Sequence, residues 1–580
     1  MPLSEEINEE FGNFCINVTK DTLSKCVSLC KEHHLSAEDL VYGWVAYSSE
    51  HGRPALTDAR LEVMVRSKLS GKSKSQADPL QSSSIKIYTK DTIDQAPRSV
   101  LPAGSSPVGS QATKRQTTPT QVTPKRGPGL PSGQAVPSRS ALFSPTSYSP
   151  TVTAPSERYE SRTGRGDVIA SWGPEVADWT ADAEPAGPAA PLGPARLQRP
   201  YRYMFERLRD RTDVLNAHIL ALGERLQRHH GLEEYAQPHA VAQEPVCAVG
   251  RIACDGQGRL NSKSILLEGG KGTYGEARHV ELDVSQVQDV GLFTGQVVAV
   301  TGVNPTGKTF VASSIFSSAP PPPADPAHLT HELTLLAACG PFTTAEDLLY
   351  TPLRDLLAEA ARLKPHLLLL MGPFIDAKII ENELAETYQQ LWNRLLELMR
   401  TALAGSHTQV LLLPSTADLH AEPVMPTPPL ATAAGPFTML PNPCCFAVDG
   451  LVIGATSTDV LMHLSQQDIK LPGPGSSDRL ARLSGYLIGQ QSFYPLYPAE
   501  ESVGLDFQHW QQHCQLPVLP HLLITPSDFR GFVKEVSGCL VVNPSRLARG
   551  QVGGSYARIR TPTTKDGLFQ DKFAVQVLKI

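Results

Sequence analysis

The stretch PHLLLLMGPFID, Pro365 to Asp376, contains a short apolar run that stops at Gly372-Pro373. An apolar run of this length between turn residues is typical of a strand that is buried on both faces of a sheet. It lies between two segments with helical patterning, from about Thr344 to Leu363 and from about Glu381 to Ala404. This alternation of strand and helix predicts an α/β domain.

The same alternation continues over residues 328–580, a length within the usual size of one domain. Further strands are predicted at HELTLLAACG, TQVLLLPS, CCFAVDG, LVIGATS, HLLITPS, GCLVVNPS, YARIRT and KFAVQVLKI. Ligands of such domains gather at the carboxyl ends of the strands. The candidate site is therefore the set of strand tips, at Cys339-Gly340-Pro341, Gly372 to Asp376, Pro414 to Asp418, Thr525 to Asp528 and Asn543-Pro544-Ser545.

A second domain is predicted over residues 243–318. It offers five extended runs, which are VCAVGRIACD, SILLEG, HVELDVS, QVVAVTGVN and TFVASSIF, joined by glycine-rich turns. Five short strands with such turns predict a small β-barrel of the OB type. Residues 201–242, which precede it, form a predicted helix and connector with an apolar stripe at Leu208, Leu215, Ile219, Leu222 and Leu226.

The barrel contains TGVNPTGKTF, Thr301 to Phe310, which matches the phosphate-binding loop pattern G-x-x-x-x-G-K-T. That motif needs a helix after the lysine and threonine, so that a helix N-terminus faces the phosphates. Here an alternating, β-prone segment follows, and Pro320 to Pro323 comes soon after it. We therefore predict the turn of a β-hairpin, in which Gly307 has positive φ and Lys308 is exposed, and not an ATPase.

Two further segments precede the barrel. Residues 1–71 are predicted to be a small helical interaction module, with a helix start at Ser36 and another near Thr57-Asp58. Residues 72–200 are rich in Ser, Thr, Pro and Gly, so they are predicted to be a disordered linker. The linker carries four candidate phosphorylation sites before proline, at Thr118, Thr123, Ser144 and Ser149.

The composition limits the classes of function. The net charge of −6 over 580 residues does not indicate a globally basic nucleic-acid binder, so any contact with DNA is expected to be weak or indirect. The ten cysteines are scattered, which favours a reducing compartment over a disulfide framework. No segment has the length and apolar character of a membrane span, so no membrane association is expected.

The order of the strand tips resembles the calcineurin-like metallophosphoesterases. In that family the tips carry D-x-H, G-D-x-x-D, G-N-H-[DE] and a final G-H-x-H, because a two-metal site needs several carboxylates and imidazoles. The positions that correspond to these ligands hold other residues here, at Cys339, Pro341, Pro373, Ser415 and Asn543. Two acids survive near the expected places, Asp376 and Asp418, with His420 and His521 close in sequence. We interpret the two acids as helix caps or loop hydrogen-bond acceptors, and expect neither metal nor cofactor.

An OB barrel followed by such a domain resembles the B (accessory) subunits of the replicative DNA polymerases, and within them those of polymerase α–primase. The motifs are GRIACDGQGRLNSKSILLEG, VELDVSQVQDVGLFTGQVVAVTGVNPTGKTF, LLLLMGPFID, LLLPSTAD, LLITPSDF and VVNPSRLARGQVGG. The resemblance covers residues 201–580. It departs at His420 to Pro429, where an aromatic residue and a glutamine are expected around the prolines.

The resemblance implies a multidomain α+β protein. Its parts are the helical module, the linker, the OB barrel and an inactive phosphoesterase-like domain. It also implies a nuclear, non-catalytic scaffold in the initiation of DNA replication. The partners that it implies are the C-terminal zinc-bearing region of the polymerase α catalytic subunit, primase through the complex, and other replication factors through residues 1–71.

Two alternatives remain open. One is a residual metal-dependent phosphodiesterase that uses Asp376, Asp418 and the nearby histidines. The other is single-stranded DNA binding by the barrel, which needs aromatic rings on a basic groove. The candidate residues for that groove are Tyr274, Phe293, Phe310, Phe316, Lys263, Lys271, Arg278 and Lys308.

Overall fold

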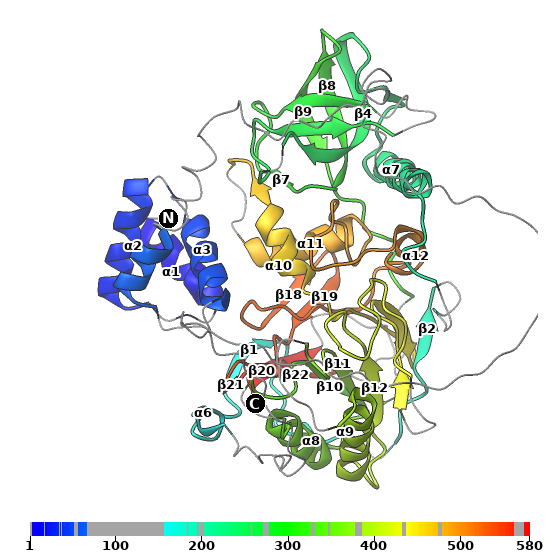
Figure 1. Ribbon diagram of the computed structural model, residues 1–580. Coiled ribbons are helices and arrows are strands. Elements are labelled where there is room, and N and C mark those ends of the chain that lie inside the picture. The colour runs from blue at the N-terminus through cyan, green and yellow to red at the C-terminus, as the bar shows by residue number, and fades with distance from the viewer. Residues whose placement is uncertain are drawn as a thin grey trace, which may run out of the picture. The chain divides into compact units, whose positions relative to one another are not determined.

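Figure 1 shows the computed structural model of the chain. The structure describes residues 3–65, 156–197 and 202–580, with gaps at 15, 17, 34, 36, 51–55, 182–183, 194–196, 257, 271–277, 326–330, 346–347, 378–385, 432–436, 474–477 and 562–572. The four candidate phosphorylation sites at Thr118, Thr123, Ser144 and Ser149 lie outside the described residues, as do Ser36, Lys271 and Tyr274.

The described part of the N-terminal segment consists mainly of helices, as predicted. Its helices are α1 (Leu3–Asn13), α2 (Lys20–His33) and α3 (Ala37–Glu50). Helix α1 contacts both of the others, and Phe11 and Trp44 are almost fully buried. Residues 58–65 form the helix that was predicted near Thr57-Asp58.

The predicted linker over residues 72–200 extends too far, because its last part contains regular structure. The elements there are α6 (Glu157–Glu160), β1 (Val168–Trp172) and β2 (Ala190–Leu192). Strand β1 pairs antiparallel with β23 (Ala574–Lys579), and β2 pairs antiparallel with β14 (Cys444–Val448). Tyr159 and Trp179 in this segment are buried. A few large side chains and two added strands are enough to order a segment whose average composition is that of a linker.

The barrel has the five strands that were predicted. They are β4 (Ala242–Cys254), β5 (Ile265–Glu268), β6 (His279–Asp283), β8 (Val297–Asn304) and β9 (Thr309–Phe316). The order is β4-β5-β6-β9-β8, and pairing of β4 with β8 closes the sheet on itself. Strand β3 (Tyr235–Ala236) adds to β4 in parallel. Closure removes the exposed edges that an open sheet would present.

Helix α7 (Leu208–His230) leads into the barrel. Its stripe of Leu215, Ile219, Leu222 and Leu226 is buried, as predicted. Leu208 is an exception, because its side chain is 81% exposed in the first turn. Gly223 lies where a Cβ atom would come within 3.0 Å of Val249, so the absence of a side chain lets the helix approach β4 closely.

The segment that matches the phosphate-binding loop is a β-hairpin. Residues 305–308 form the turn between β8 and β9, and Val303 pairs with Val311 across it. Gly307 has a φ of 73°, and Lys308 is exposed. A strand follows Lys308 where the motif requires a helix, so the geometry for cradling phosphates is not formed.

The C-terminal α/β domain contains two sheets. The first has seven strands in the order β1-β23-β22-β10-β11-β12-β13. Its remaining bounds are β10 (Thr334–Cys339), β11 (Leu367–Met371), β12 (Gln409–Leu413), β13 (Phe437–Met439) and β22 (Ser555–Arg560). Strands β10 to β13 are parallel, and β22, β23 and β1 are antiparallel.

The second sheet has six strands in the order β18-β19-β17-β15-β14-β2. Its remaining bounds are β15 (Leu451–Ala455), β17 (Leu522–Ile524), β18 (Phe532–Val536) and β19 (Cys539–Asn543). The other elements of the domain are α10 (Val460–Gln467), β16 (Ile469–Lys470), α11 (Arg479–Gly489), α12 (Phe507–His513), and the short pair β20 (Ala548–Arg549) and β21 (Val552–Gly553).

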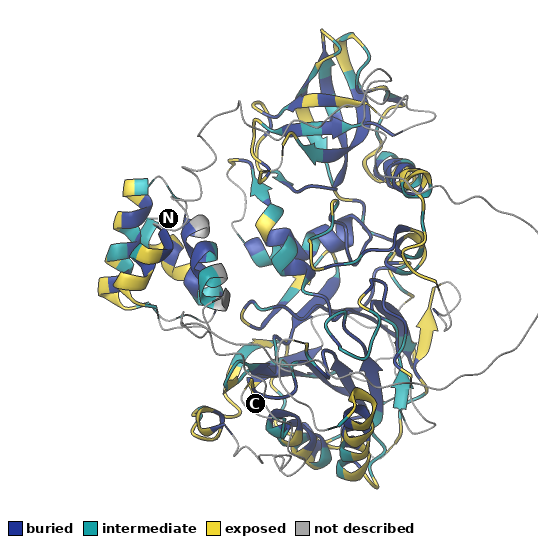
Figure 2. Ribbon diagram, viewed as in Figure 1, coloured by how far each residue is buried: buried dark blue, intermediate teal, exposed yellow. Residues whose placement is uncertain are grey.

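Alternation along the strands explains how the two sheets pack. In β10, Leu335, Ala337 and Cys339 belong to a core that includes Leu522 and Ile524 of the second sheet. The intervening Leu336 and Ala338 face helices α8 (Thr351–Leu363) and α9 (Tyr388–Ala402). Figure 2 shows the strands of both sheets largely buried, whereas α8 and α9 each have an exposed face. Helix α8 begins several residues later than predicted. The predicted start of α9 near Glu381 lies outside the described residues, and the described helix begins at Tyr388.

Candidate functional site

The predicted site consists of the loops that follow β10, β11, β12, β17 and β19. The loop after β15 was not predicted to belong to it, but β15 is the neighbour of β17 in the sheet. We call the six loops together the strand-tip edge. Asp418 is one of the two acids that the sequence analysis singled out there, and its side chain is buried. The carboxylate accepts hydrogen bonds from the backbone N–H groups of Phe374 at 2.5 Å, Ile375 at 2.9 Å and Ser415 at 2.9 Å. Asp418 therefore ties the loop after β11 to the loop after β12. Asp376 also pairs with Asp418, as an isolated antiparallel bridge.

The environment of Asp418 disfavours its ionised form. Burial raises the pKa of Asp418 to about 7, and the three backbone N–H groups oppose this effect only in part. The negative charge of Asp376 raises the pKa of Asp418 further. A carboxylate whose lone pairs already accept three backbone hydrogen bonds has little capacity left for a ligand.

An arginine occupies the centre of the strand-tip edge. Arg546 follows β19, and its side chain is 14% exposed. Its Nε atom lies 3.0 Å from Asp528 after β17, and its Nη2 atom lies 3.4 Å from Asp459 after β15. Burial alone would lower the pKa of Arg546, but the negative charges around it raise the pKa above its usual value. The guanidinium thus supplies a fixed positive charge between two carboxylates.

Cys339, at the end of β10, completes this cluster. Its thiol donates to the carbonyl oxygen of Gly372 at 3.2 Å and accepts from Nη1 of Arg546 at 3.1 Å. Burial raises the pKa of the Cys339 thiol to about 11, although Arg546 opposes the effect. At neutral pH the sulfur is therefore a thiol, and not a nucleophilic or metal-binding thiolate.

Asn543, which directly ends β19, holds neighbouring loops together. Its Oδ1 atom accepts from the N–H groups of Ser527 at 2.9 Å and Ser545 at 2.8 Å. Its Nδ2 atom donates to the carbonyl oxygens of Phe529 at 3.4 Å and Arg530 at 3.3 Å. The amide uses both its donors and its acceptor to hold the loops after β17 and β19, and it is fully buried.

The residues of this edge do not fit the metal pair of a phosphoesterase. Among the residues that the structure describes, no group of three His, Cys, Asp or Glu side chains is placed to hold a metal ion. Pro341 and Pro373 offer no side-chain ligand, and Ser415 is buried with its hydroxyl accepting from the N–H of Ala417. We therefore derive no chemical step through a metal.

Sequence proximity suggested that two histidines could join this site, but among the described residues neither belongs to a group that could hold a metal ion. His521 precedes β17, so it lies at the amino end of that strand, where its Nδ1 atom accepts from the N–H of Val452 at 3.0 Å. Burial lowers the pKa of His521. His420 packs with its ring centroid 4.9 Å from that of Trp392 in α9. The structure therefore brings Asp376 and Asp418 together, but among the described residues the two histidines do not join them as a metal-binding group.

The barrel residues considered for single-stranded DNA are also not arranged as a stacking surface. Phe293 and Phe310 are fully buried, so their faces are not accessible to bases. Phe316 is partly buried and contacts the ring of His230. Lys263 and Lys308 are exposed, but no accessible ring of this set accompanies them among the described residues.

Sequence reasoning missed the junction between the barrel and the α/β domain. The side chain of Gln490, just after α11, accepts from the N–H of Val297 at 2.8 Å and donates to its carbonyl oxygen at 3.0 Å. Gln490 also donates to Ser317, and the next residue, Gln491, donates to Ala319. Strand β7 (Gly291–Leu292) pairs with β16 at the same junction. A glutamine pair that follows an amphipathic helix gives no specific signal in a sequence.

Three family models, all of them for the B subunits of replicative DNA polymerases, match segments of this chain. The model of the N-terminal region of the DNA polymerase alpha B subunit matches residues 5–70, and the model of the OB domain of that same B subunit matches residues 212–318. The model of the DNA polymerase alpha/epsilon B subunit matches residues 335–534. Full-length relatives extend these matches. The chain is 31% identical to the DNA polymerase alpha B subunit of Rattus norvegicus, over all of this chain and 99% of that protein.

The chain belongs to the family of DNA polymerase alpha B subunits. This confirms the resemblance seen in the sequence, and the OB match confirms the assignment of the barrel. The family member from Drosophila melanogaster is 31% identical over the whole length of both proteins. The member from Saccharomyces cerevisiae is 26% identical over 63% of this chain and 61% of that protein. Within the described residues, no helix is long and apolar enough to cross a membrane.

Proposed function

We propose that the protein is a non-catalytic accessory subunit of the DNA polymerase α–primase complex, which acts as a scaffold in the initiation of DNA replication in the nucleus. One observation carries the proposal. The strand-tip edge, where an enzyme of this architecture would bind its metals, uses its polar groups to hold its own loops together. Asp418, Asn543 and Arg546 each make at least two of these contacts.

The junction supports a scaffold over an enzyme. The hydrogen bonds of Gln490 and Gln491, together with the β7–β16 pairing, join the barrel and the α/β domain through directional contacts. A surface that spans two domains joined in this way is largely formed before a partner arrives. A preformed surface binds with a smaller ordering cost than a flexible one.

We propose that the barrel and the α/β domain bind the C-terminal zinc-bearing region of the polymerase α catalytic subunit, and that primase joins through that subunit. The α/β domain would be an inactive relative of the calcineurin-like phosphoesterases. Residues 1–71 would bind other replication factors, and phosphorylation at Thr118, Thr123, Ser144 or Ser149 would regulate that binding. The names of the relatives and the family match support this assignment.

The test is co-expression of the full chain with the C-terminal region of a polymerase α catalytic subunit, followed by measurement of the mass of the product. A stable one-to-one complex is expected. The same preparation, supplied with Mn²⁺ or Zn²⁺, is expected to hydrolyse no phosphodiester above the level of an Asp376→Ala, Asp418→Ala variant. Two separate species in the first measurement, or metal-dependent hydrolysis that the double substitution abolishes, would contradict the proposal.

A further inference from the structure

A cavity of about 670 Å³ lies between α7 and the segment that follows α12. We call it the basic cavity. Helix α7 lines it with Ala217, His218, Ala221, Arg225, Arg228 and His229. The opposite side consists of Ala319, Pro320, Pro322, Gln491, Gln511, Gln515, Leu516 and Pro517. No aspartate or glutamate is among these residues, although acids outnumber bases in the chain as a whole.

The charges of the basic cavity are not neutralised within the described structure. Arg225 and Arg228 are both exposed, and the ion pairs found among the described residues include neither of them. Arg225 donates to the side-chain oxygen of Gln491, which is a neutral group. Burial and the positive charge of Arg228 lower the pKa of Arg225, with only a minor opposing effect from Glu224. Two repelling guanidinium groups in one hollow favour an anionic ligand.

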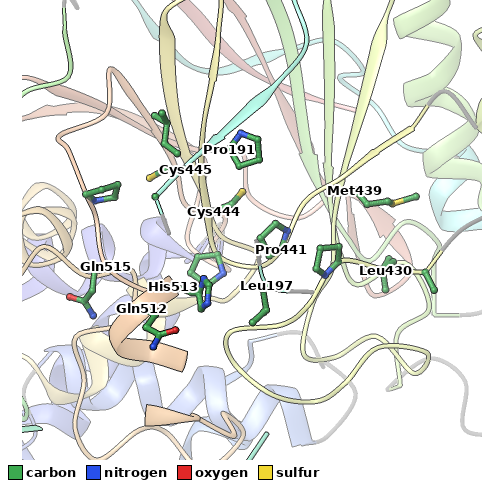
Figure 3. Close-up of a pocket in the computed structure, with 16 residues that line it drawn as sticks. Pro191, Leu197, Leu430, Met439, Pro441, Cys444, Cys445, Gln512, His513 and Gln515 are labelled. Atoms are coloured by element: carbon green, nitrogen blue, oxygen red, sulfur yellow. The ribbon is translucent and has the colours of Figure 1, made fainter. Parts of the chain in front are cut away.

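A second cavity, of about 570 Å³, lies next to the first. We call it the apolar cavity. It shares Gln515 and Pro517 with the basic cavity, so the two cavities are adjacent, and we call them together the groove. Figure 3 shows Gln512, His513 and Gln515 on one side of it, and Leu430 and Met439 on the other. Five prolines line it, at positions 191, 429, 441, 443 and 517, together with Leu192, Leu197 and Leu430.

The charge and shape of the groove together point to one kind of occupant. We propose that the groove binds an extended segment of a partner protein in which an acidic stretch lies beside apolar residues. Carboxylates of that segment would contact Arg225 and Arg228, which suit planar, two-point recognition of carboxylates. Its apolar residues would enter the apolar cavity, where burial of carbon surface stabilises the complex. The small side chains of Ala217 and Ala221 let a backbone approach α7 closely.

The same lining argues against nucleic acid as the occupant. Neither cavity is lined by Phe, Tyr or Trp, so bases would find no ring of these types on which to stack. Burial lowers the pKa of His218 to about 4, so its ring adds no positive charge for a phosphate at neutral pH. Half of the groove is apolar, whereas a phosphate backbone needs positive charge along its whole path. A protein segment that changes from acidic to apolar matches both halves.

The groove can bind such a segment whichever protein supplies it, so this binding can succeed or fail independently of the proposed function. The measurement uses the full chain and a fluorescein-labelled peptide that carries a run of glutamates followed by alternating leucines and prolines. Fluorescence anisotropy is expected to show saturable binding at low salt. Binding should weaken at ~0.15 M salt, where charges more than ~8 Å apart are largely screened.

Charge reversal tests the basic cavity directly. Arg225→Glu with Arg228→Glu is expected to weaken peptide binding by about tenfold or more, because two attractive contacts become repulsive. Arg209→Glu is the matched control, because Arg209 is on the same helix, is 88% exposed and does not line either cavity. It is expected to change binding by less than about twofold.

The apolar cavity is tested by Leu192→Asp, since Leu192 is 37% exposed on the edge strand β2 and its replacement leaves the core intact. Weaker peptide binding with an unchanged thermal unfolding midpoint is expected. Equal affinity of the wild-type protein and the Arg225→Glu, Arg228→Glu variant would overturn the proposal. So would tighter, competitive binding of a single-stranded oligonucleotide that depends on the same two arginines, because the occupant would then be nucleic acid.

Discussion

The strand-tip edge and the groove beside α7 are both polar, but they differ in what their polar groups do. At the strand-tip edge, Asp418, Asn543 and Arg546 each bind neighbouring loops of the same domain. In the groove, Arg225 and Arg228 face a hollow with no carboxylate in its lining. A position at the carboxyl ends of parallel strands is therefore a weaker indication of a ligand site than the presence of polar groups that have no hydrogen-bond or ionic partner within the protein.

The comparison predicts two kinds of variant. Substitutions at the strand-tip edge, or at the equally closed junction, are expected to lower the free energy of unfolding without changing partner binding in a folded sample. Substitutions in the groove are expected to weaken binding and leave stability unchanged.

The largest effect is expected for Arg546→Leu. Removing the guanidinium leaves the carboxylates of Asp459 and Asp528 close together without their common cation, which should cost about 3 kcal/mol of unfolding free energy. Denaturant unfolding measures this loss of unfolding free energy. Arg530→Leu is the control, because the Arg530 side chain is exposed and makes a long contact of 3.5 Å to the carbonyl oxygen of Ile169. If Mn²⁺ or Zn²⁺ restored the stability of the Arg546→Leu variant, the contrast between the strand-tip edge and the groove would fail, because the edge would then contain a cation-binding site.

The next effect is expected for Gln490→Ala at the junction. The substitution leaves the buried N–H and carbonyl of Val297 without their side-chain partners, which should cost about 2 kcal/mol. Limited proteolysis should also cut residues 316–324 faster, since the chain there joins the barrel to the α/β domain. An unchanged cutting rate together with unchanged stability would mean that other contacts hold the two domains together.

A smaller effect concerns the dependence of stability on pH. The pKa of Asp418 is about 7 in the folded protein, against an ordinary value near 3.9 in an unfolded chain. Between these values the folded state binds more protons than the unfolded state, so this group makes stability fall as the pH rises from about 4 to about 7. Asp418→Asn removes the ionisation and should reduce this fall by at least about 1 kcal/mol. The test is to measure the free energy of unfolding of the wild-type protein and of Asp418→Asn at pH 4.5 and pH 7.5. A steeper fall in Asp418→Asn would contradict the assigned sign.

The smallest effect is expected for Arg228→Ala in the groove. Arg228 is exposed, and its Nε atom donates a 3.3 Å hydrogen bond to the carbonyl oxygen of Glu224. Its loss should change the free energy of unfolding by less than about 0.5 kcal/mol. Denaturant unfolding at low salt is the measurement. A loss comparable to that of Arg546→Leu would show that the groove, like the strand-tip edge, is part of the internal structure.

The sequence predicted the fold well where one face or both faces of an element are buried. The leucine runs of β11 and β12 and the amphipathic α8 and α9 follow directly from apolar patterning. Strands β1 and β2 were missed because their partners lie hundreds of residues away, and because each is short and at a sheet edge. The composition of a short segment gives no information about a partner strand that lies so far away in the sequence.

The position of the strand-tip edge was predicted from the sequence, but the role of Arg546 at its centre was not. Arg546 lies within a motif that carried the family resemblance, yet its role depends on Asp459 and Asp528 from two other loops. One signal could have found the cluster. Each of the three charges follows within a few residues of the end of a strand, and those strands are the neighbours β15, β17 and β19. Sequence proximity was misleading for His521, because it precedes its strand and so lies at the opposite end of the sheet.

The pairing of β1 with β23 has a consequence for how the protein is made. Val168 pairs with Leu578, so β1 leaves the ribosome about 400 residues before its partner strand exists. At the usual ~5–20 residues per second, that delay is roughly 20–80 s. Strand β10 waits in the same way for β22. The seven-stranded sheet therefore completes only after its last strands are synthesised, and until then its unpaired strand edges are candidates for chaperone binding.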